Sequence, residues 1–152
     1  MADNLGFRIS DLSRLLRRQF DERARRIGVT RPQWRTLTML RRNEGINQSG
    51  LAELLEVEPI SLCRMIDRLE EAGLVERRRD PMDRRAWRIF LTDKSRPTIE
   101  RLEVIADELF EVALDGIHAA ERDRLFDALD RIRSNLGANQ TEFEIEQASN
   151  HG

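Results

Sequence analysis

Residues Leu74–Thr92 read LVERRRDPMDRRAWRIFLT and hold six arginines, in a chain whose formal net charge is −2. Apolar and charged residues alternate on both sides of Asp80–Asp83, which is typical of two short β-strands joined by a turn. Pro81 stands at the second position of that turn, where its fixed backbone angle is favoured. The sequence therefore predicts a β-hairpin with strands over Val75–Arg79 and Ala86–Leu91. On the second strand, three apolar residues fall on one face: Trp87, Ile89 and Leu91.

Two helices are predicted immediately before this hairpin. Asn47 is a suitable N-cap for a short helix that ends near Leu55, and Pro59 is well placed to open a longer helix that runs to about Ala72. Only Glu56–Glu58 separate the two helices, which leaves room for a tight turn. A short helix, a tight turn and a longer helix form the helix-turn-helix motif, and the hairpin after it makes the motif a winged one.

Further helices are predicted on both sides of this winged motif. Apolar spacing predicts a first helix from Leu5 to about Gly28, and a second helix capped by Thr30 that ends near Gly45. After the hairpin, Ser95 is the expected N-cap of a helix that has Pro97 in its first turn and reaches about Ile117. A last helix is expected to stop at Gly137. The fold class predicted is mainly α with a small β-hairpin wing.

The predicted boundaries give a winged helix-turn-helix lobe over residues 30–92 and a helical dimerisation lobe from helices over 5–28 and 96–137. Together these make one domain over residues 1–138. The polar residues 139–152 are expected to form a disordered tail.

The helix that opens at Pro59 has two chemically different sides. Its core-facing positions are apolar: Leu62, Met65, Ile66 and Leu69. Ser61, Arg64 and Arg68 lie on the other side. Arginine can donate two hydrogen bonds to guanine O6 and N7, so these positions suit a helix that reads the DNA major groove. The alternative is a surface helix whose arginines only pair with Glu71 or Asp67.

The hairpin arginines favour the DNA interpretation. Like charges crowded on a two-stranded ribbon repel each other unless a polyanion lies close by. Arginines at the tip of such a ribbon can enter the minor groove, and we expect Asp83 to pair with Arg85 and hold it extended. The arginines concerned are Arg77, Arg78, Arg79, Arg84, Arg85 and Arg88. The helix and the hairpin together therefore predict binding to double-stranded DNA.

The stretch from Leu51 to Thr92 also resembles the winged helix-turn-helix core of the MarR (multiple-antibiotic-resistance regulator) family. The matching features are LAELL, RMIDRLEEAGLVER, the DRR of the hairpin and the closing LT, and the resemblance extends from about Leu5 to Gly137. It implies a bacterial transcription regulator that acts as a homodimer on a pseudo-palindromic operator. It also implies DNA contacts from Ser61, Arg64 and Arg85, with Asp83 as the partner of Arg85; Arg68 and Arg84 are added from spacing and charge. Glu56 departs from the family pattern, because many members have glycine in this turn.

Dimerisation and a small effector are also expected. The first, fifth and sixth helices carry more apolar surface than the DNA-binding lobe needs, so we expect a second copy of the chain to cover it. The alternative is that these helices fold back on their own subunit. The resemblance implies a small aromatic or anionic effector, and Trp34 is a candidate to line its pocket or else a core residue.

Cys63 and His118 each have two possible roles. Cys63 is a candidate sensor of oxidants or an inert small apolar residue. His118 fits a solvated or capping role better than metal binding or catalysis.

Several classes of protein are disfavoured by the sequence. No apolar run is long enough for a membrane span, the N-terminus lacks the apolar core of a secretory signal, and the single cysteine suggests a reducing cytoplasm. Cysteine and histidine are not spaced as zinc ligands, and no cofactor is expected. We find no paired nucleophile and base and no Gly-rich phosphate loop, so an enzyme is not expected. The main alternative function is a winged-helix module that binds acidic proteins without sequence-specific DNA binding.

Overall fold

The chain is described by a computed structural model that covers the backbone of residues 4–150 and the side chains of residues 4–137. It separates into two compact units, Met1–Phe110 and Glu111–Gly152, which are described separately below. Within the described residues, no helix combines the length and the apolar character that a membrane span requires. The predicted fold class is confirmed, since the described elements are α-helices, one short 3-10 turn and one small antiparallel hairpin.

Side chains that cap helices fix where the first three helices begin. Asn4 accepts a hydrogen bond from the Phe7 backbone N–H before α1. Thr30 and Gln33 form a reciprocal capping box at the start of α2, and Asn47 accepts from the Gly50 N–H at 2.7 Å before α3. The helices are α1 (Leu5–Arg26), α2 (Arg31–Arg42), α3 (Gln48–Leu55) and α4 (Pro59–Glu71). The predicted caps at Thr30 and Asn47 are therefore confirmed.

The turn between α3 and α4 places Glu56 in the left-handed region, with φ 54° and ψ 44°. The resemblance noted above leads to an expectation of glycine in this turn, and glycine adopts this conformation without strain. The Cβ of an ordinary residue is crowded in this conformation, at a cost of about 1–2 kcal/mol. The departure at Glu56 therefore leaves the geometry of the turn intact and strains one residue.

The hairpin pairs β1 (Val75–Arg79) with β2 (Trp87–Leu91), in the register Val75↔Leu91 and Arg79↔Trp87. Ile89 is buried, and Trp87 and Leu91 pack against the same core, so the predicted apolar face of β2 is confirmed. The connection is longer than predicted. The hydrogen-bonded turn runs from Asp83 to Ala86, whose N–H donates to the Asp83 carbonyl, and not over Asp80–Asp83.

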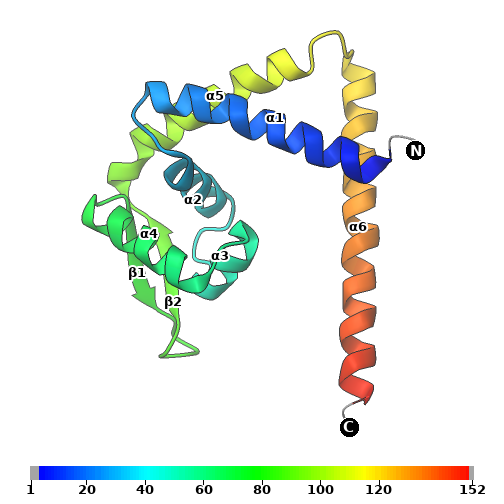
Figure 1. Cartoon of the computed structure of the whole chain (residues 1–152). Coiled ribbons are helices and arrows are strands. Elements are labelled where there is room, and N and C mark those ends of the chain that lie inside the picture. The colour runs from blue at the N-terminus through cyan, green and yellow to red at the C-terminus, as the bar shows by residue number, and fades with distance from the viewer. Residues whose placement is uncertain (1–3, 151–152) are drawn as a thin grey trace. The chain divides into compact units, whose positions relative to one another are not determined.

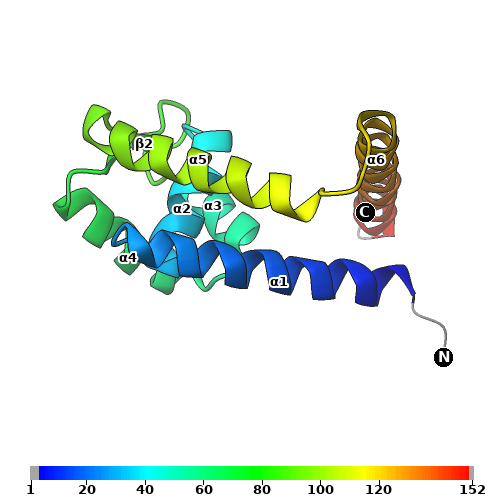
Figure 2. The same ribbon diagram turned by 90° about the horizontal axis from the view of Figure 1, so that it is seen from above.

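The core of the first unit collects side chains from every helix of that unit and from both strands. Leu37 and Leu40 of α2, Leu51 of α3 and Ile66 of α4 are fully buried. Figure 2 shows α2 and α3 between α1 and α5 (Arg96–Ala113), and Figure 1 shows the hairpin loop projecting from the end of the unit that carries α3 and α4. The hairpin loop and α4 therefore share the side of the unit that faces away from α1.

The predicted start and end of the helix after the hairpin need correction. A 3-10 turn over Asp93–Ser95 precedes α5, and the Ser95 hydroxyl donates to the Thr92 carbonyl at 2.7 Å. Ser95 is thus a buried donor and not the accepting N-cap that was predicted. α5 ends at Ala113, before the predicted Ile117, because the chain turns through Gly116 at φ 80°.

The last helix, α6 (Ala119–Asn150), continues through Gly137, so the predicted stop there is wrong. A glycine within a helix costs only about 1 kcal/mol relative to alanine and does not by itself end the helix. The side chains after Gly137 lie outside the described residues. The disordered tail over residues 139–152 and the division at residue 138 therefore stay predictions.

Candidate nucleic-acid interface

Helix α4 separates an apolar side from a polar, exposed side. Leu62, Ile66 and Leu69 are buried, and Ser61, Arg64 and Arg68 are all exposed. Neither Arg64 nor Arg68 has an ion-pair partner among the residues whose side chains the structure describes. The alternative in which these arginines only neutralise Asp67 or Glu71 therefore receives no support from the described contacts.

Asp67 is instead engaged by Arg77 of β1. The Arg77 Nη2 atom lies 2.7 Å from Asp67 Oδ1, and Arg77 Nη1 lies 3.2 Å from Glu70 Oε1. The same guanidinium donates to the Gln48 side chain and to the Cys63 carbonyl. Its side chain is only 13% exposed. Burial lowers the pKa of Arg77, but its hydrogen bonds and ion pairs outweigh this and raise the pKa above its usual value.

Three more hairpin arginines also have partners within the protein. Arg78 pairs with Glu76 and lies over the Phe90 ring, at 4.0 Å from the ring centroid. Arg79 lies 4.0 Å from the centroid of the Trp87 ring. Arg88 donates to the Gly45 carbonyl at 2.7 Å. The sequence argument counted all six arginines as like charges that need a polyanion nearby, but four of them are held within the protein by carboxylates, carbonyls or aromatic rings.

The remaining two arginines, Arg84 and Arg85, are exposed in the hairpin loop. Two aspartates shape this loop. Asp80 Oδ1 accepts from the Met82 N–H at 2.9 Å, and Asp83 Oδ1 accepts from the Arg85 N–H at 3.0 Å. The predicted pairing of Asp83 with the Arg85 side chain is not seen, because Asp83 contacts Arg85 only through its backbone N–H. Within the described part of the chain, neither arginine guanidinium has a polar partner.

The Trp34 side chain of α2 packs against α1. Its ring centroid is 4.4 Å from that of Phe20, and its Nε1 atom donates to Asp21 Oδ1 at 2.6 Å. Arg31 pairs with the other oxygen of Asp21. Burial alone would raise the pKa of Asp21. The opposing effects are larger and lower this pKa: they are the hydrogen bonds from Arg31 and Trp34 and the charges of Arg31 and Arg25. These contacts fit the core alternative for Trp34, and its role as a ligand contact stays a prediction.

Sequence reasoning missed Asp21 and the partners of Arg77. Asp21 was detectable, because it is an acid three residues before Ala24 on the buried stripe of α1. For Arg77, strand alternation indicates the same face as buried Val75, but nothing along the sequence indicates its partners on α3 and α4.

The two remaining candidate residues are Cys63 and His118. Cys63 is half-buried, and its Sγ atom lies 3.8 Å from Arg77 Nη2. These contacts do not test whether Cys63 senses oxidants, so that role stays a prediction. His118 is exposed just before α6. Among the side chains that the structure describes, no group of three or more His, Cys, Asp or Glu is arranged to hold a metal ion.

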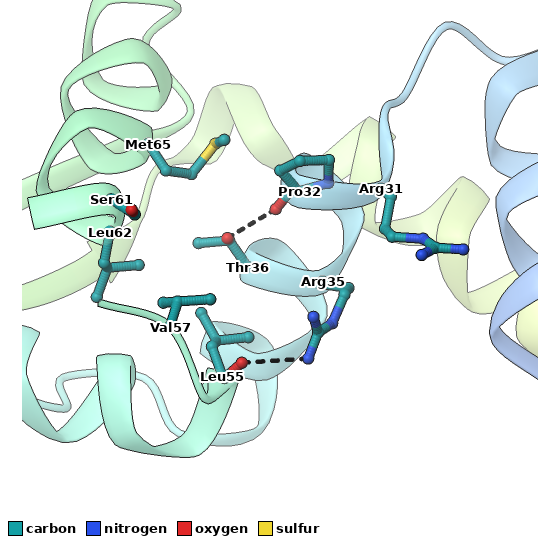
Figure 3. A pocket seen from close by; sticks show the side chains of 9 residues that line it. All are labelled: Arg31, Pro32, Arg35, Thr36, Leu55, Val57, Ser61, Leu62 and Met65. Atoms are coloured by element: carbon teal, nitrogen blue, oxygen red, sulfur yellow. Dashed lines mark hydrogen bonds between the residues drawn. The ribbon is translucent and has the colours of Figure 1, made fainter. Parts of the chain in front are cut away.

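A cavity of about 280 Å³ lies between the start of α2 and the first turns of α4. Figure 3 shows that Pro32 and Thr36 face Leu62 and Met65 across it. Two arginines border it: Arg31, already bonded to Asp21, and Arg35, whose Nη2 donates to the Leu55 carbonyl at 3.3 Å. The cavity is therefore mostly apolar, with cationic groups at its border.

A helix-turn-helix with an arginine-bearing wing, flanked by further helices, defines a winged helix-turn-helix protein of the kind that regulates transcription. Comparison with known proteins specifies the class further. The family model described as MarR matches residues 29–87. A MarR transcriptional regulator from Methanosarcina mazei Go1 is 30% identical, with a TM-score of 0.75, over 86% of this chain and 94% of that chain. The transcriptional regulator PA3341 is 34% identical, with a TM-score of 0.77, over 89% of this chain and 99% of that chain.

The transcriptional regulator SlyA is 28% identical, with a TM-score of 0.73, over 90% of this chain and 96% of that chain. These three solved structures cover 86–90% of this chain and so match more than the winged motif. This chain belongs to the MarR family of transcriptional regulators.

Proposed function

We propose that this MarR-family regulator binds double-stranded DNA as a homodimer at a pseudo-palindromic operator in the bacterial cytoplasm. Helix α4 enters the major groove, and the hairpin loop, which we call the wing (residues 80–86), reaches the minor groove. The observation that carries this proposal is the set of four exposed arginines without described partners: Arg64, Arg68, Arg84 and Arg85. The proposed function requires no catalysis and no cofactor.

Recognition by α4 follows from its exposed face. Arg64 is the proposed base contact, because a guanidinium can donate two parallel hydrogen bonds to one guanine. Ser61 is in the first turn of α4, where backbone N–H groups without helical partners and a short hydroxyl favour phosphate or base-edge contacts. Arg68, one turn further along, is the proposed phosphate contact. We therefore expect base specificity from Arg64 and general affinity from Arg68.

The wing supplies the second contact. Arg84 and Arg85 lie at adjacent positions of a loop whose backbone is braced by Asp80 and Asp83. A braced loop loses little conformational entropy on binding, and a narrow minor groove attracts arginine through its enhanced negative potential. Arg79 of β1 also stabilises the loop backbone, because its Nη1 donates to the Arg84 carbonyl at 2.7 Å. We propose that Arg85 enters the groove and that Arg84 contacts the flanking phosphate.

Homodimerisation is supported by uncovered apolar surface on both units. On α1 the large apolar side chains left exposed are Leu5, Phe7, Ile9, Leu12 and Leu15. On α6 they are Leu125, Phe126, Leu129 and Leu136. Such stripes on one chain are normally covered by a partner, and a two-fold axis would set two copies of α4 about one turn of DNA apart (~34 Å).

Control by a small aromatic or anionic effector is the last part of the proposal. The cavity bordered by Arg31 and Arg35 has apolar walls and lies against the first turns of α4. A ligand that binds better to one position of α4 would shift the population that can bind DNA. Effector binding at this cavity would therefore change operator affinity without touching the DNA.

Selection of bound fragments from a random duplex pool tests the function directly. We expect an inverted repeat whose half-sites are centred about 10 base pairs apart. Recovery of fragments with no common sequence would contradict the proposal and favour the protein-interaction module.

Repeating the selection with aromatic carboxylic acids present tests control by an effector, because an effector should reduce or raise the recovered fraction of the same repeat.

A further inference from the structure

Ile60 is a large apolar residue on the side of α4 that faces away from the core. It is the second residue of the helix, and 65% of its surface is exposed. An isoleucine side chain this exposed contributes little to packing in the protein core, and alanine would be a better helix former at this position. A large apolar group at this position therefore suggests a contact outside the chain.

The helical spacing aligns Ile60 with the arginines proposed to contact DNA. Residues four apart lie on one face of a helix, so Ile60 is the neighbour of Arg64 and, one further turn on, of Arg68. The buried residues Leu62, Ile66 and Leu69 lie on the opposite side. Ile60 is also absent from the lining of the cavity next to α4, which takes Ser61, Leu62 and Met65 from this helix. Ile60 is thus part of the outward face, beside Arg64.

The surroundings of Ile60 decide what it can contact. Its neighbours Ser61 and Arg64 are polar or cationic, so an apolar protein partner would leave an unpaired guanidinium in its interface. The major groove offers the opposite combination, with hydrogen-bond acceptors and anionic phosphates together with one apolar group, the C5 methyl of thymine. A branched aliphatic side chain flanked by a guanidinium matches a thymine methyl flanked by guanine acceptors.

We propose that Ile60 is a specificity-determining residue that contacts the C5 methyl group of one thymine in each operator half-site. The inference rests on the proposed DNA binding by α4 and adds to it a base preference that hydrogen bonds do not supply. The thymine read by Ile60 lies next to the base read by Arg64, because the two side chains are one helical turn apart.

The test uses the full-length protein and the operator recovered by selection. Each thymine of a half-site is replaced singly by deoxyuridine, which removes only the methyl group, and binding is measured by fluorescence anisotropy. For the native sequence, one thymine per half-site should be sensitive, with Kd rising about fourfold, the effect of losing one buried methyl group. Ile60→Ala should weaken binding to the unmodified operator and abolish the difference between thymine and uracil at that position.

Leu54→Ala is the matched control, because Leu54 is a similarly exposed aliphatic residue on α3, outside the recognition helix. This variant should keep the full methyl dependence of the native protein. Equal loss on deoxyuridine substitution in the native protein and in Ile60→Ala, or no sensitive thymine, would overturn the inference while leaving the proposed DNA binding intact. Absence of any preferred duplex for the native protein would refute both.

Discussion

Arg77 of β1 and Asp67 of α4 form an ion pair with their Nη2 and Oδ1 atoms 2.7 Å apart. The same guanidinium reaches Gln48 of α3 and Glu70 of α4, so one side chain joins both helices of the helix-turn-helix to the first strand of the hairpin. Arginine suits this position because it holds five donors in a rigid planar fork. The ion pair also keeps Asp67 away from Arg64 and Arg68, which leaves those two cations available on the exposed face.

Replacing Arg77 should therefore reduce stability more than replacing its neighbour on the strand. Arg77→Met leaves Asp67 and Glu70 without their cation and removes a mostly buried hydrogen-bond donor, with an expected loss of about 2–3 kcal/mol in unfolding free energy. Arg78→Met breaks an exposed pair with Glu76, so the expected loss is below about 1 kcal/mol. Urea denaturation at one fixed protein concentration compares the two. Equal losses would contradict the role assigned to Arg77.

Loss of the Arg85 guanidinium should weaken operator binding strongly and leave the folded dimer unchanged. The Arg85 side chain is exposed and bonded to no described group, so Arg85→Ala removes a proposed DNA contact without leaving a buried group unpaired. We expect Kd to rise on the order of tenfold or more, and the magnitude of the slope of log K against log salt to fall by about two, one for each wing of the dimer. Gel-shift titrations at several salt concentrations measure both quantities.

Arg41→Ala is the control for that experiment, since Arg41 is an exposed arginine of α2 paired with Glu103, outside α4 and the wing. Its operator affinity should stay close to that of the native protein. If Arg41→Ala and Arg85→Ala had the same effect, the contribution would be general positive charge and not a wing contact.

Arg64 and Arg68 are expected to respond differently to changes in DNA sequence. Arg64→Ala should cost about 1–3 kcal/mol per half-site of the preferred operator and relax specificity at one base pair in each half-site. Arg68→Ala should weaken binding to all sequences by a similar factor. A panel of operators with single base-pair changes, titrated against both variants, separates the two roles. Uniform weakening by Arg64→Ala would reassign Arg64 to the phosphate backbone.

Asp21 should make stability depend on pH in the acid range. Its pKa is lower in the folded chain than its ordinary value of 3.8, so the unfolded chain binds more protons as the pH falls. The stabilisation from Arg31 is therefore fully present at neutral pH and is lost as the pH falls below about 3.8 through the folded pKa.

The variant Asp21→Asn keeps an acceptor for Trp34 but lacks the charge. It should be less stable than the native chain by about 1–3 kcal/mol at pH 7, with a difference that shrinks below pH 3.8. Asp11→Asn, at an exposed pair with Arg14, should show little difference at either pH. A gap between Asp21→Asn and the native chain that stays constant from pH 7 to acid would count against this assignment.

Local chemistry made most of the fold predictable. Thr30 and Asn47 have short polar side chains placed directly before apolar helical repeats, and both are N-caps in the structure. The alternation around Trp87–Leu91 gave the correct strand and the correct buried face. These features depend on residues within four or five positions of one another, which is the range that sequence patterns report.

Features that depend on tertiary contacts were harder to predict. Strand alternation places Arg77 on the face of buried Val75, but only the folding of the hairpin against α4 surrounds it with acids while Arg85 stays exposed. Trp34 and Asp21 are thirteen positions apart on different helices, so their hydrogen bond has no local signature. Gly137 follows the last apolar helical position and so predicts a helix end, but a glycine in a long helix is a modest local cost that neighbouring residues can offset.

In the proposed complex, two copies of the chain bind one operator with both copies of α4 and both wings. Sedimentation of the protein with the selected inverted repeat, and with the same repeat carrying five extra base pairs between its half-sites, tests it most directly. The extra half turn puts the half-sites on opposite sides of the duplex, so a symmetric dimer can contact only one. We predict two chains per duplex on the original repeat and a loss of affinity on the order of 10³-fold or more for the lengthened one. One chain per duplex, or equal affinity for the two DNAs, would contradict it.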